Sequence, residues 1–268
     1  MEGIEEKKGI ICDMDGVIYH GNSLLDGAKD FVQWLYRRNK NFIFLTNSSW
    51  HTPKELQHKL AKMGLDVDKK HFYTAALATA SFIKSQNPCA SVYPIGERGL
   101  YEALENANIS ITDGSPDYVV VGESSSYGYD NIIRAVRHVN NGAKLIGTCS
   151  DLTAPWEGGI LPACRSLIAP IEYATGRQAY FIGKPNPLMM RTALRLLNVH
   201  SDDTAIIGDR MDTDIIAGIE TGMDTVLVLS GVTKREDIDR FAYAPKYIIN
   251  GVGEIPEKLS CGIKGEEA

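Results

Sequence analysis

The sequence lacks the marks of several protein classes. No apolar run approaches the length that spans a membrane, and the first eight residues have no apolar core of the kind a signal peptide needs. The five cysteines are odd in number and widely spaced, and no CxxC occurs. This pattern argues against a disulfide framework or a structural zinc site and suits a reducing compartment. We therefore expect a cytoplasmic protein without membrane contact.

Basic charge is also scarce. The chain has 28 Lys and Arg against 34 Asp and Glu, for a net charge of −6, so it has no basic footprint for a nucleic-acid polymer. Motifs of other catalytic classes are missing as well: HExxH, a Walker loop and a GxSxG elbow do not occur, and Gly251-Val-Gly253 lacks the third glycine of a dinucleotide fingerprint. A small anionic ligand would need local positive charge, from a metal or from one placed Lys or Arg.

What the chain does have is apolar content, 44% of its 268 residues, in an alternation of strand-like and helix-like segments. This alternation predicts an α/β fold with a Rossmann-like parallel sheet. We expect strands at 10–12, 41–45, 92–95, 118–121, 144–148, 179–182, 204–207, 225–229 and 246–249, and helices at 28–38, 54–63, 100–107, 132–140, 167–175 and 188–197. A stretch rich in Pro and Gly between Cys149 and Arg165 is expected to be a long loop.

Polar residues follow several of these strands. Asp13 and Asp15 come directly after the first strand, and Gly16 lets the chain turn there. The same position after later strands is taken by further polar residues: Thr46, Asn47, Lys184 and Asp209. Because the carboxyl ends of parallel strands share one edge of a sheet, we expect these residues to meet although nearly 200 positions separate them. Two strand-end acids are costly without a partner, and a bound cation is a suitable one.

The same residues carry a family resemblance. The segments Asp13-Met-Asp-Gly-Val17, Thr46-Asn47, Gly183-Lys-Pro-Asn-Pro187 and Gly208-Asp-Arg-Met-Asp-Thr-Asp214 resemble, in order and spacing, the four motifs of the haloacid dehalogenase (HAD) superfamily. More narrowly, they look like the NagD/4-nitrophenylphosphatase-like subfamily, type IIA with a C2 cap. The resemblance implies a HAD-like catalytic core at 1–78 and 180–268 and an inserted α/β cap domain at 79–179.

The resemblance also implies roles for the two acids of the first motif. Asp13 would be the nucleophile that forms an aspartyl-phosphate, and Asp15 would be the general acid and then the base. Mg²⁺ would be held by the carboxylates of Asp13 and Asp209 and by the backbone carbonyl of Asp15, with Asp214 supporting this set. Asp212 is expected to be an acidic loop residue outside this set.

Phosphate binding is assigned to the remaining motif residues. Lys184 would supply fixed positive charge, Thr46 a hydroxyl, and Asn47 a backbone N–H. Backbone N–H groups at Asp15 and Gly16 would cradle the transferred phosphoryl group. The function expected from these parts is Mg²⁺-dependent hydrolysis of small phosphorylated metabolites, such as sugar phosphates or nucleoside monophosphates.

The expected cap departs from the family pattern. Where relatives usually show Pro-Gly-x-Gly-Ser, this chain has Pro162-Ala-Cys-Arg-Ser166. We hypothesise that Arg165 contacts an acidic leaving group, against the alternative of a structural ion pair. Trp156 could wall off a leaving group or pack in the core.

Other functions stay open at this level. A phosphotransferase or mutase could use the same motifs, and a ligand-sensing relative without catalysis is a further alternative. Dehalogenation needs neither the second acid nor Mg²⁺, so Asp15 argues against it. Related caps often pair, which leaves a homodimer open.

Overall fold

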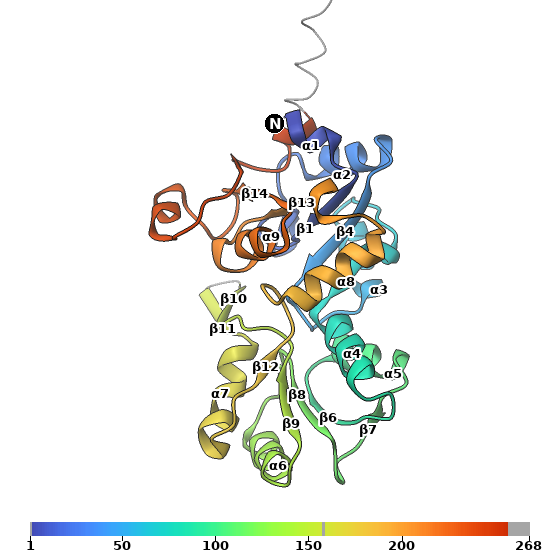
Figure 1. Cartoon of the computed structure of the whole chain (residues 1–268), viewed down its shortest axis with the longest axis vertical. Helices are drawn as coiled ribbons and strands as arrows, with labels where there is room; N and C mark the ends of the chain where they lie inside the picture. Colours follow the sequence, from blue (N-terminus) through green and yellow to red (C-terminus); the bar gives the residue numbers. More distant parts are fainter. Residues whose placement is uncertain (1, 157–158, 257–268) are drawn as a thin grey trace, which may run out of the picture. The chain divides into compact units, whose positions relative to one another are not determined.

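The computed structural model describes residues 2–156 and 159–256. Its contacts divide the chain into two compact units (Figure 1). The first unit holds the described residues of 1–45, 59–72 and 190–268, and the second holds residues 46–58 and 73–189. These divisions differ from the expected limits of core and cap, 1–78 with 180–268 and 79–179, so those limits stay a proposal.

A six-stranded sheet in the order β15-β14-β13-β1-β4-β5 organises the first unit. Its central strands β1 and β13 are buried along their whole length. This is expected of a parallel sheet, since such a sheet is normally covered on both faces. β1 pairs in parallel with both β13 and β4, and Cys12 lies opposite Ile207 and Phe44. The strands are β1 (Gly9–Cys12), β4 (Asn41–Thr46), β5 (Phe72–Thr74), β13 (Thr204–Gly208), β14 (Asp224–Val228) and β15 (Tyr247–Ile249).

The helix α2 (Ala28–Arg37) of the first unit has the spacing of apolar residues that the sequence predicts. Its residues Ala28, Phe31, Val32 and Leu35 are buried on one side, as an amphipathic helix requires. The other helices are α1 (Glu2–Glu6), α9 (Ile216–Thr221) and a one-turn π-helix, η3 (Met211–Ile215), while α3 (Pro53–Lys62) and α8 (Pro187–Leu197) each begin in the second unit and end in the first. A short hairpin, β2 (Tyr19–His20) with β3 (Ser23–Leu24), follows the first motif.

The second unit has its own five-stranded sheet, β12-β9-β8-β6-β7. Val119, Val121 and Leu145 from its central strands pack against Ile168 and Ile171 of α7 in a buried core. The strands are β6 (Ser91–Ile95), β7 (Ser110–Ile111), β8 (Tyr118–Val121), β9 (Lys144–Gly147) and β12 (Tyr180–Phe181). The helices are α4 (Ala75–Gln86), α5 (Arg98–Asn106), α6 (Tyr129–Asn140) and α7 (Cys164–Thr175).

Two expectations were wrong. The strand expected at residues 179–182 exists as β12 but pairs with β9 in the five-stranded sheet, although Lys184, which follows it, was expected to share a sheet edge with Asp13. A strand of two residues carries no periodicity that could assign it to one sheet or the other. The expected loop between Cys149 and Arg165 contains an antiparallel pair, β10 (Thr153–Trp156) and β11 (Gly159–Pro162), where Pro155 pairs with Ile160.

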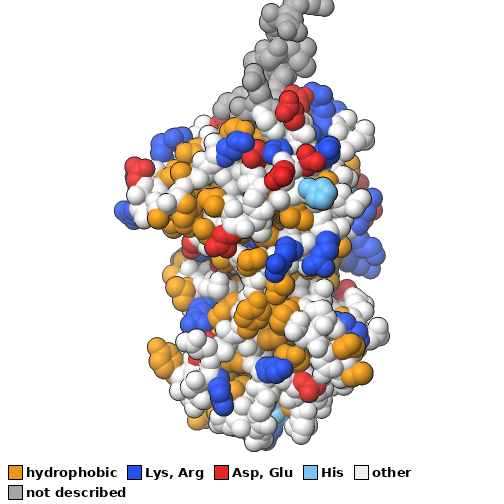
Figure 2. Space-filling view, in the orientation of Figure 1, with side chains coloured by type: hydrophobic (Ala, Val, Ile, Leu, Met, Phe, Trp, Pro, Cys, Tyr) orange, Lys and Arg blue, Asp and Glu red, His pale blue; other side chains and the backbone are white. Residues whose placement is uncertain are grey.

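Positive and negative side chains are mixed on the visible surface. On the face drawn in Figure 2, Lys and Arg side chains are interspersed with Asp and Glu among the described residues. Within the described ranges, no helix combines the length and apolar character needed to cross a bilayer. None of the four described cysteines, Cys12, Cys89, Cys149 and Cys164, is in a disulfide, and Cys261 lies outside the described residues.

Candidate active site

Three carboxylates meet at the carboxyl edge of the six-stranded sheet. Asp13 follows β1, Asp209 follows β13, and Asp214 lies in η3. One oxygen from each lies within 4.8 Å of the other two. The parallel pairing of β1 with β13 brings the first two together, since Cys12 and Ile207 are opposite each other. Asp209 and Asp214 are buried, and a bound cation would offset this concentration of negative charge.

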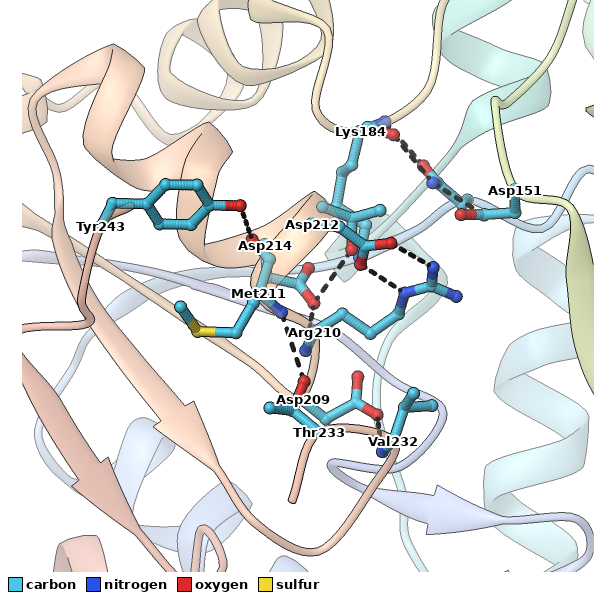
Figure 3. Close-up of polar contacts among 12 residues, drawn as sticks. Asp151, Lys184, Asp209, Arg210, Met211, Asp212, Asp214, Val232, Thr233 and Tyr243 are labelled. Carbon is cyan, nitrogen blue, oxygen red and sulfur yellow. Dashed lines mark hydrogen bonds and ion pairs between the residues drawn. The ribbon is translucent and has the colours of Figure 1, made fainter. Parts of the chain in front are cut away.

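Glycines make room for Asp209. A Cβ on Gly16 would lie 2.5 Å from Asp209 Oδ2, and one on Gly231 would lie 2.0 Å from the same oxygen. The backbone N–H of Val232 donates to Asp209 Oδ2 at 2.7 Å (Figure 3). Ser230 Oγ donates to the Gly16 carbonyl at 2.7 Å and joins the two glycine segments. The chain around Asp209 is therefore built for backbone to approach a carboxylate closely.

Asp214 and Asp212 have different environments although two positions separate them. Asp214 is fully buried and accepts from the backbone N–H of Arg210 at 3.2 Å. Asp212 pairs with the Arg210 guanidinium through both oxygens, at 3.0 and 2.8 Å (Figure 3). Burial alone would raise the pKa of Asp212, but its bonds to Arg210 hold that pKa below the usual value. The carboxylate cluster therefore includes Asp214 and not Asp212.

The donor set suits a hard divalent cation. Carboxylate oxygens are the ligands that Mg²⁺ and Ca²⁺ prefer, and no cysteine or histidine belongs to the cluster among the described residues. Asp209 and Asp214 are both buried, which fits a cation held between carboxylates.

Asp15 stands apart from the cluster. Its side chain is 46% exposed, and its nearest basic atom is His20 Nδ1 at 3.8 Å from Oδ1. Partial burial raises the pKa of Asp15, an effect that the positive charges of Lys59 and His20 reduce. A carboxyl group that holds its proton more tightly than usual is suited to act as a general acid.

Lys59 is a neighbour that sequence reasoning missed. It comes from α3, and its Nζ lies 4.0 Å from the centre of the Tyr19 ring. Burial lowers the pKa of Lys59, and the charge of Asp15 raises it in part. Helical spacing predicts that Lys59 is on a helix, but it carries no sign of which acid the lysine approaches.

Gly16 does not have the free amide that was expected. Its backbone N–H donates to the Tyr19 carbonyl at 2.9 Å, so in this conformation it is engaged within the turn and not available to phosphate. Its φ of 75° closes that turn. Gly16 thus contributes through its missing side chain and its backbone conformation.

The second unit brings together the remaining motif residues. Lys184 is buried, and its backbone is held by the Asn47 side chain: Oδ1 accepts from Lys184 N at 2.7 Å, and Nδ2 donates to Lys184 O at 3.0 Å. Gly183 has no room for a side chain, since a Cβ would lie 2.6 Å from Asn47 Oδ1. Thr46 ends β4, and its Oγ1 accepts from the Ser48 N–H at 3.1 Å.

Arg165 and Trp156 are the two residues for which a role in substrate specificity was considered. Arg165 pairs with Glu172 at 3.0 Å and its guanidinium lies 4.9 Å from the centre of the Phe181 ring, which is the ion-pair alternative. Trp156 ends β10, and the placement of its side chain lies outside the described residues, as does Gly158.

Comparison with known proteins agrees with this geometry. A haloacid dehalogenase-like hydrolase family matches residues 10–110, and a HAD-hydrolase-like family matches residues 181–255. A dihydroxyacetone phosphatase of Corynebacterium glutamicum is 42% identical over 92% of this chain and 90% of its own length. The chain belongs to the haloacid dehalogenase superfamily.

Solved structures of similar proteins place the chain more narrowly within this superfamily. NagD from Escherichia coli K-12 is 40% identical, with a TM-score of 0.88 over 92% of this chain and 98% of its own. The 4-nitrophenylphosphatase from Thermotoga maritima is 31% identical, with a TM-score of 0.91 over 95% of this chain and 98% of its own. The expected NagD-like subfamily and the α/β fold with a parallel-sheet core are confirmed. This HAD-like protein is a phosphoric monoester hydrolase, a phosphatase.

Proposed function

We propose that this phosphatase hydrolyses small phosphomonoesters through an aspartyl-phosphate, with Mg²⁺ as cofactor. The observation that carries the proposal is the cluster of Asp13, Asp209 and Asp214, whose oxygens lie within 4.8 Å of one another, with the less acidic Asp15 two residues after Asp13. Bound Mg²⁺ would supply charge neutralisation for the phosphate dianion. Its ligands would be Asp13, Asp209 and the Asp15 carbonyl, with Asp214 in support.

The chain's own groups carry the two chemical steps. In the first, an Asp13 oxygen forms a bond to phosphorus while the ester P–O bond breaks, and Asp15 gives its proton to the leaving oxygen. In the second, Asp15 takes a proton from water as the water oxygen bonds to phosphorus, and the bond from phosphorus to Asp13 breaks. Inorganic phosphate leaves and both acids return to their first states.

Phosphate binding is assigned to the second group of residues. Lys184 contributes its ammonium, Thr46 its hydroxyl, and Asn47 its backbone N–H. Support comes from the two hydrogen bonds that fix the Lys184 backbone on the Asn47 side chain, which hold a buried lysine in one place. At an effective dielectric of about 20, two unit charges 4 Å apart interact by roughly 4 kcal/mol, so one placed lysine matters.

The names of the relatives indicate the class of substrate. Their names specify dihydroxyacetone phosphatase, ribonucleotide monophosphatase and acid sugar phosphatase activities. We infer that the substrate is a small phosphorylated metabolite such as a sugar phosphate or a nucleoside monophosphate. The net charge of −6 supports a small-molecule enzyme over a nucleic-acid enzyme, and we place it in the cytoplasm. A core of residues 1–78 and 180–268, a cap of residues 79–179, and a homodimer complete the proposal.

The decisive test is a phosphomonoester panel assayed by phosphate release with and without Mg²⁺. We expect release that requires the metal, and Asp13→Asn should reduce kcat by at least about 10⁴-fold because the nucleophile is lost. Asp212→Asn is the matched control and should keep turnover, since Asp212 pairs only with Arg210 among its described contacts. Retained activity in Asp13→Asn would reject the covalent route, and phosphate transfer to a sugar without release would favour the phosphotransferase alternative.

A further inference from the structure

Two acidic residues outside the family motifs bind the segment that follows β4. Glu123 comes two residues after β8, and Asp151 comes four residues after β9, so both lie beyond the carboxyl ends of neighbouring strands in the five-stranded sheet. Both belong to the same compact unit as Asn47 and Lys184.

Asp151 determines which way the Asn47 amide points. Asn47 Nδ2 donates to Asp151 Oδ2 at 2.9 Å; Asp151 and Lys184 are both labelled in Figure 3. An ionised carboxylate can only accept, so it holds the NH₂ group on its own side. The Asn47 oxygen must then face the Lys184 N–H, where it accepts at 2.7 Å. The reversed amide would set oxygen against the carboxylate and NH₂ against the Lys184 N–H.

Glu123 holds the next two residues of the segment. Its Oε2 accepts from Ser48 Oγ at 2.8 Å and from Ser49 N at 2.9 Å, and Ser49 Oγ accepts from the Glu123 N–H at 3.1 Å. Gly122 permits this approach, since a Cβ there would lie 2.6 Å from Ser49 Oγ. Burial raises the pKa of Glu123, and the nearby Asp151 charge raises it further, although the bonds from Ser48 and Ser49 oppose the shift.

We propose that Asp151 and Glu123 are positioning residues for phosphate binding. Asp151 acts through the Asn47 amide on the backbone of Lys184, and Glu123 acts on the Ser48–Ser49 backbone that follows Thr46 and Asn47. Neither acid contacts phosphate in this scheme, because a carboxylate would repel it. The inference rests on the proposed function in one respect, that Lys184, Thr46 and Asn47 bind the phosphoryl group.

The test compares D151A with D151N and E123A with E123Q. Each amide variant keeps an oxygen that can accept the same hydrogen bonds, whereas alanine removes it. The matched control is E97Q, since Glu97 likewise accepts from a backbone N–H and a hydroxyl of one serine, Ser125, at 2.7 and 2.8 Å. The readouts are calorimetric binding of inorganic phosphate with Mg²⁺ present, kcat and KM, and the thermal unfolding midpoint.

We expect D151A and E123A to weaken phosphate binding and kcat/KM by about 10- to 100-fold, the range for losing one hydrogen bond to a charged group. D151N, E123Q and E97Q should stay within about threefold of the parent, because their amide oxygens still accept the hydrogen bonds that alanine removes. If D151A unfolds too readily to assay, D151S should show the same loss, since its short side chain does not reach Asn47.

Two results would overturn the proposal. Phosphate binding by both alanine variants within about twofold of the parent would remove the positioning role. Equal loss in D151N and D151A would show that the charge itself is required, which contradicts a role through the Asn47 amide. Failure of the proposed function looks different, because the parent itself would then release no phosphate from any ester while its phosphate binding could still be measured.

Discussion

Gly16 shows how much one residue without a side chain contributes to the acidic cluster. Its φ of 75° lies in the left-handed region, and its Cα approaches both Asp209 and Gly231. Any Cβ would meet an Asp209 oxygen at 2.5 Å and the Gly231 Cα at 3.0 Å. The position therefore combines a backbone requirement with a spatial one.

Replacing Gly16 by Ala should separate these two requirements. Gly21 has a similar φ of 58° but open space around it, so Gly21→Ala is a matched control. Both variants should lose roughly 1–2 kcal/mol of unfolding free energy from left-handed strain. Only Gly16→Ala should also lose at least about tenfold in kcat, because Asp209 must move. Denaturant unfolding and steady-state kinetics measure the two effects, and equal activity in the two variants would contradict the spatial requirement.

Lys59 should influence the pH dependence of turnover. Its positive charge lowers the pKa of Asp15 against the upward effect of burial, and His20 acts in the same direction. Without that charge the pKa of Asp15 rises further, so Asp15 keeps its proton to higher pH. In Lys59→Met the high-pH limb of the kcat profile should therefore move to higher pH.

The control for this experiment is Lys62→Met, which removes an exposed lysine from the same helix, α3. Its profile should match the parent. A limb in Lys59→Met that stays in place or moves to lower pH would show that Asp15 is not the group that titrates there.

At the scale of elements, α7 and β12 are joined through Glu172. It accepts from Arg165 at 3.0 Å and from the backbone N–H of Ala179 at 2.8 Å, and Arg165 also lies against the Phe181 ring. A partly exposed ion pair with a cation–π contact is worth about 0.5–1 kcal/mol. Arg165 thus has a structural use that needs no substrate.

Arg165→Ala should accordingly lose about 0.5–1 kcal/mol of unfolding free energy and keep kcat/KM on every good substrate. Glu172→Gln removes the charge of the partner and should behave alike. A drop in kcat/KM for acidic substrates in Arg165→Ala alone would restore the hypothesis that Arg165 contacts a leaving group. Denaturant titration and the substrate panel together distinguish the two cases.

Elements with strong periodicity could be predicted from the sequence closely. The buried run of β1 was expected at residues 10–12 and spans Gly9–Cys12, and α2 was expected at residues 28–38 and spans Ala28–Arg37. The alanine-rich α4 and the three-residue β5 were missed, because one shows little contrast between its faces and the other is too short for a pattern. β10 and β11 were hidden among prolines and glycines that usually mark loops.

The residues of the candidate site likewise fall into those that the sequence predicted and those that it missed. Strand-end position identified Asp13 and Asp209, since pairing of β1 with β13 follows from the parallel fold. The Gly16 amide was expected for phosphate and is used by Tyr19, because turn hydrogen bonding depends on atoms a few residues away that no motif encodes. Glu123, Asp151 and Lys59 were missed because their partners lie in other segments of the chain.

At the scale of the whole molecule, metal should affect the two units unequally. The acidic cluster belongs entirely to the first unit. A ligand at 100 times its Kd stabilises the folded state by about 2.7 kcal/mol. Chelation should therefore reduce hydrogen-exchange protection in β1 and β13 and leave β6 and β8 unchanged.

Two neighbouring variants make this measurement specific. Asp214→Asn should weaken the effect of Mg²⁺ on β1 and β13, since Asp214 is part of the cluster, and Asp212→Asn should not. Uniform loss of protection over both sheets on chelation would contradict a cation confined to the first unit.

The pairing of β1 with β13 also has a consequence for synthesis of the chain. Gly9 lies opposite Thr204, so the first strand waits for nearly 200 further residues before it gains this neighbour. A nascent chain on the ribosome has Asp13 long before it has Asp209 and Asp214. The second unit, by contrast, ends before this point and can fold first. Chemistry that needs all three carboxylates therefore waits until β13 and η3 have been synthesised.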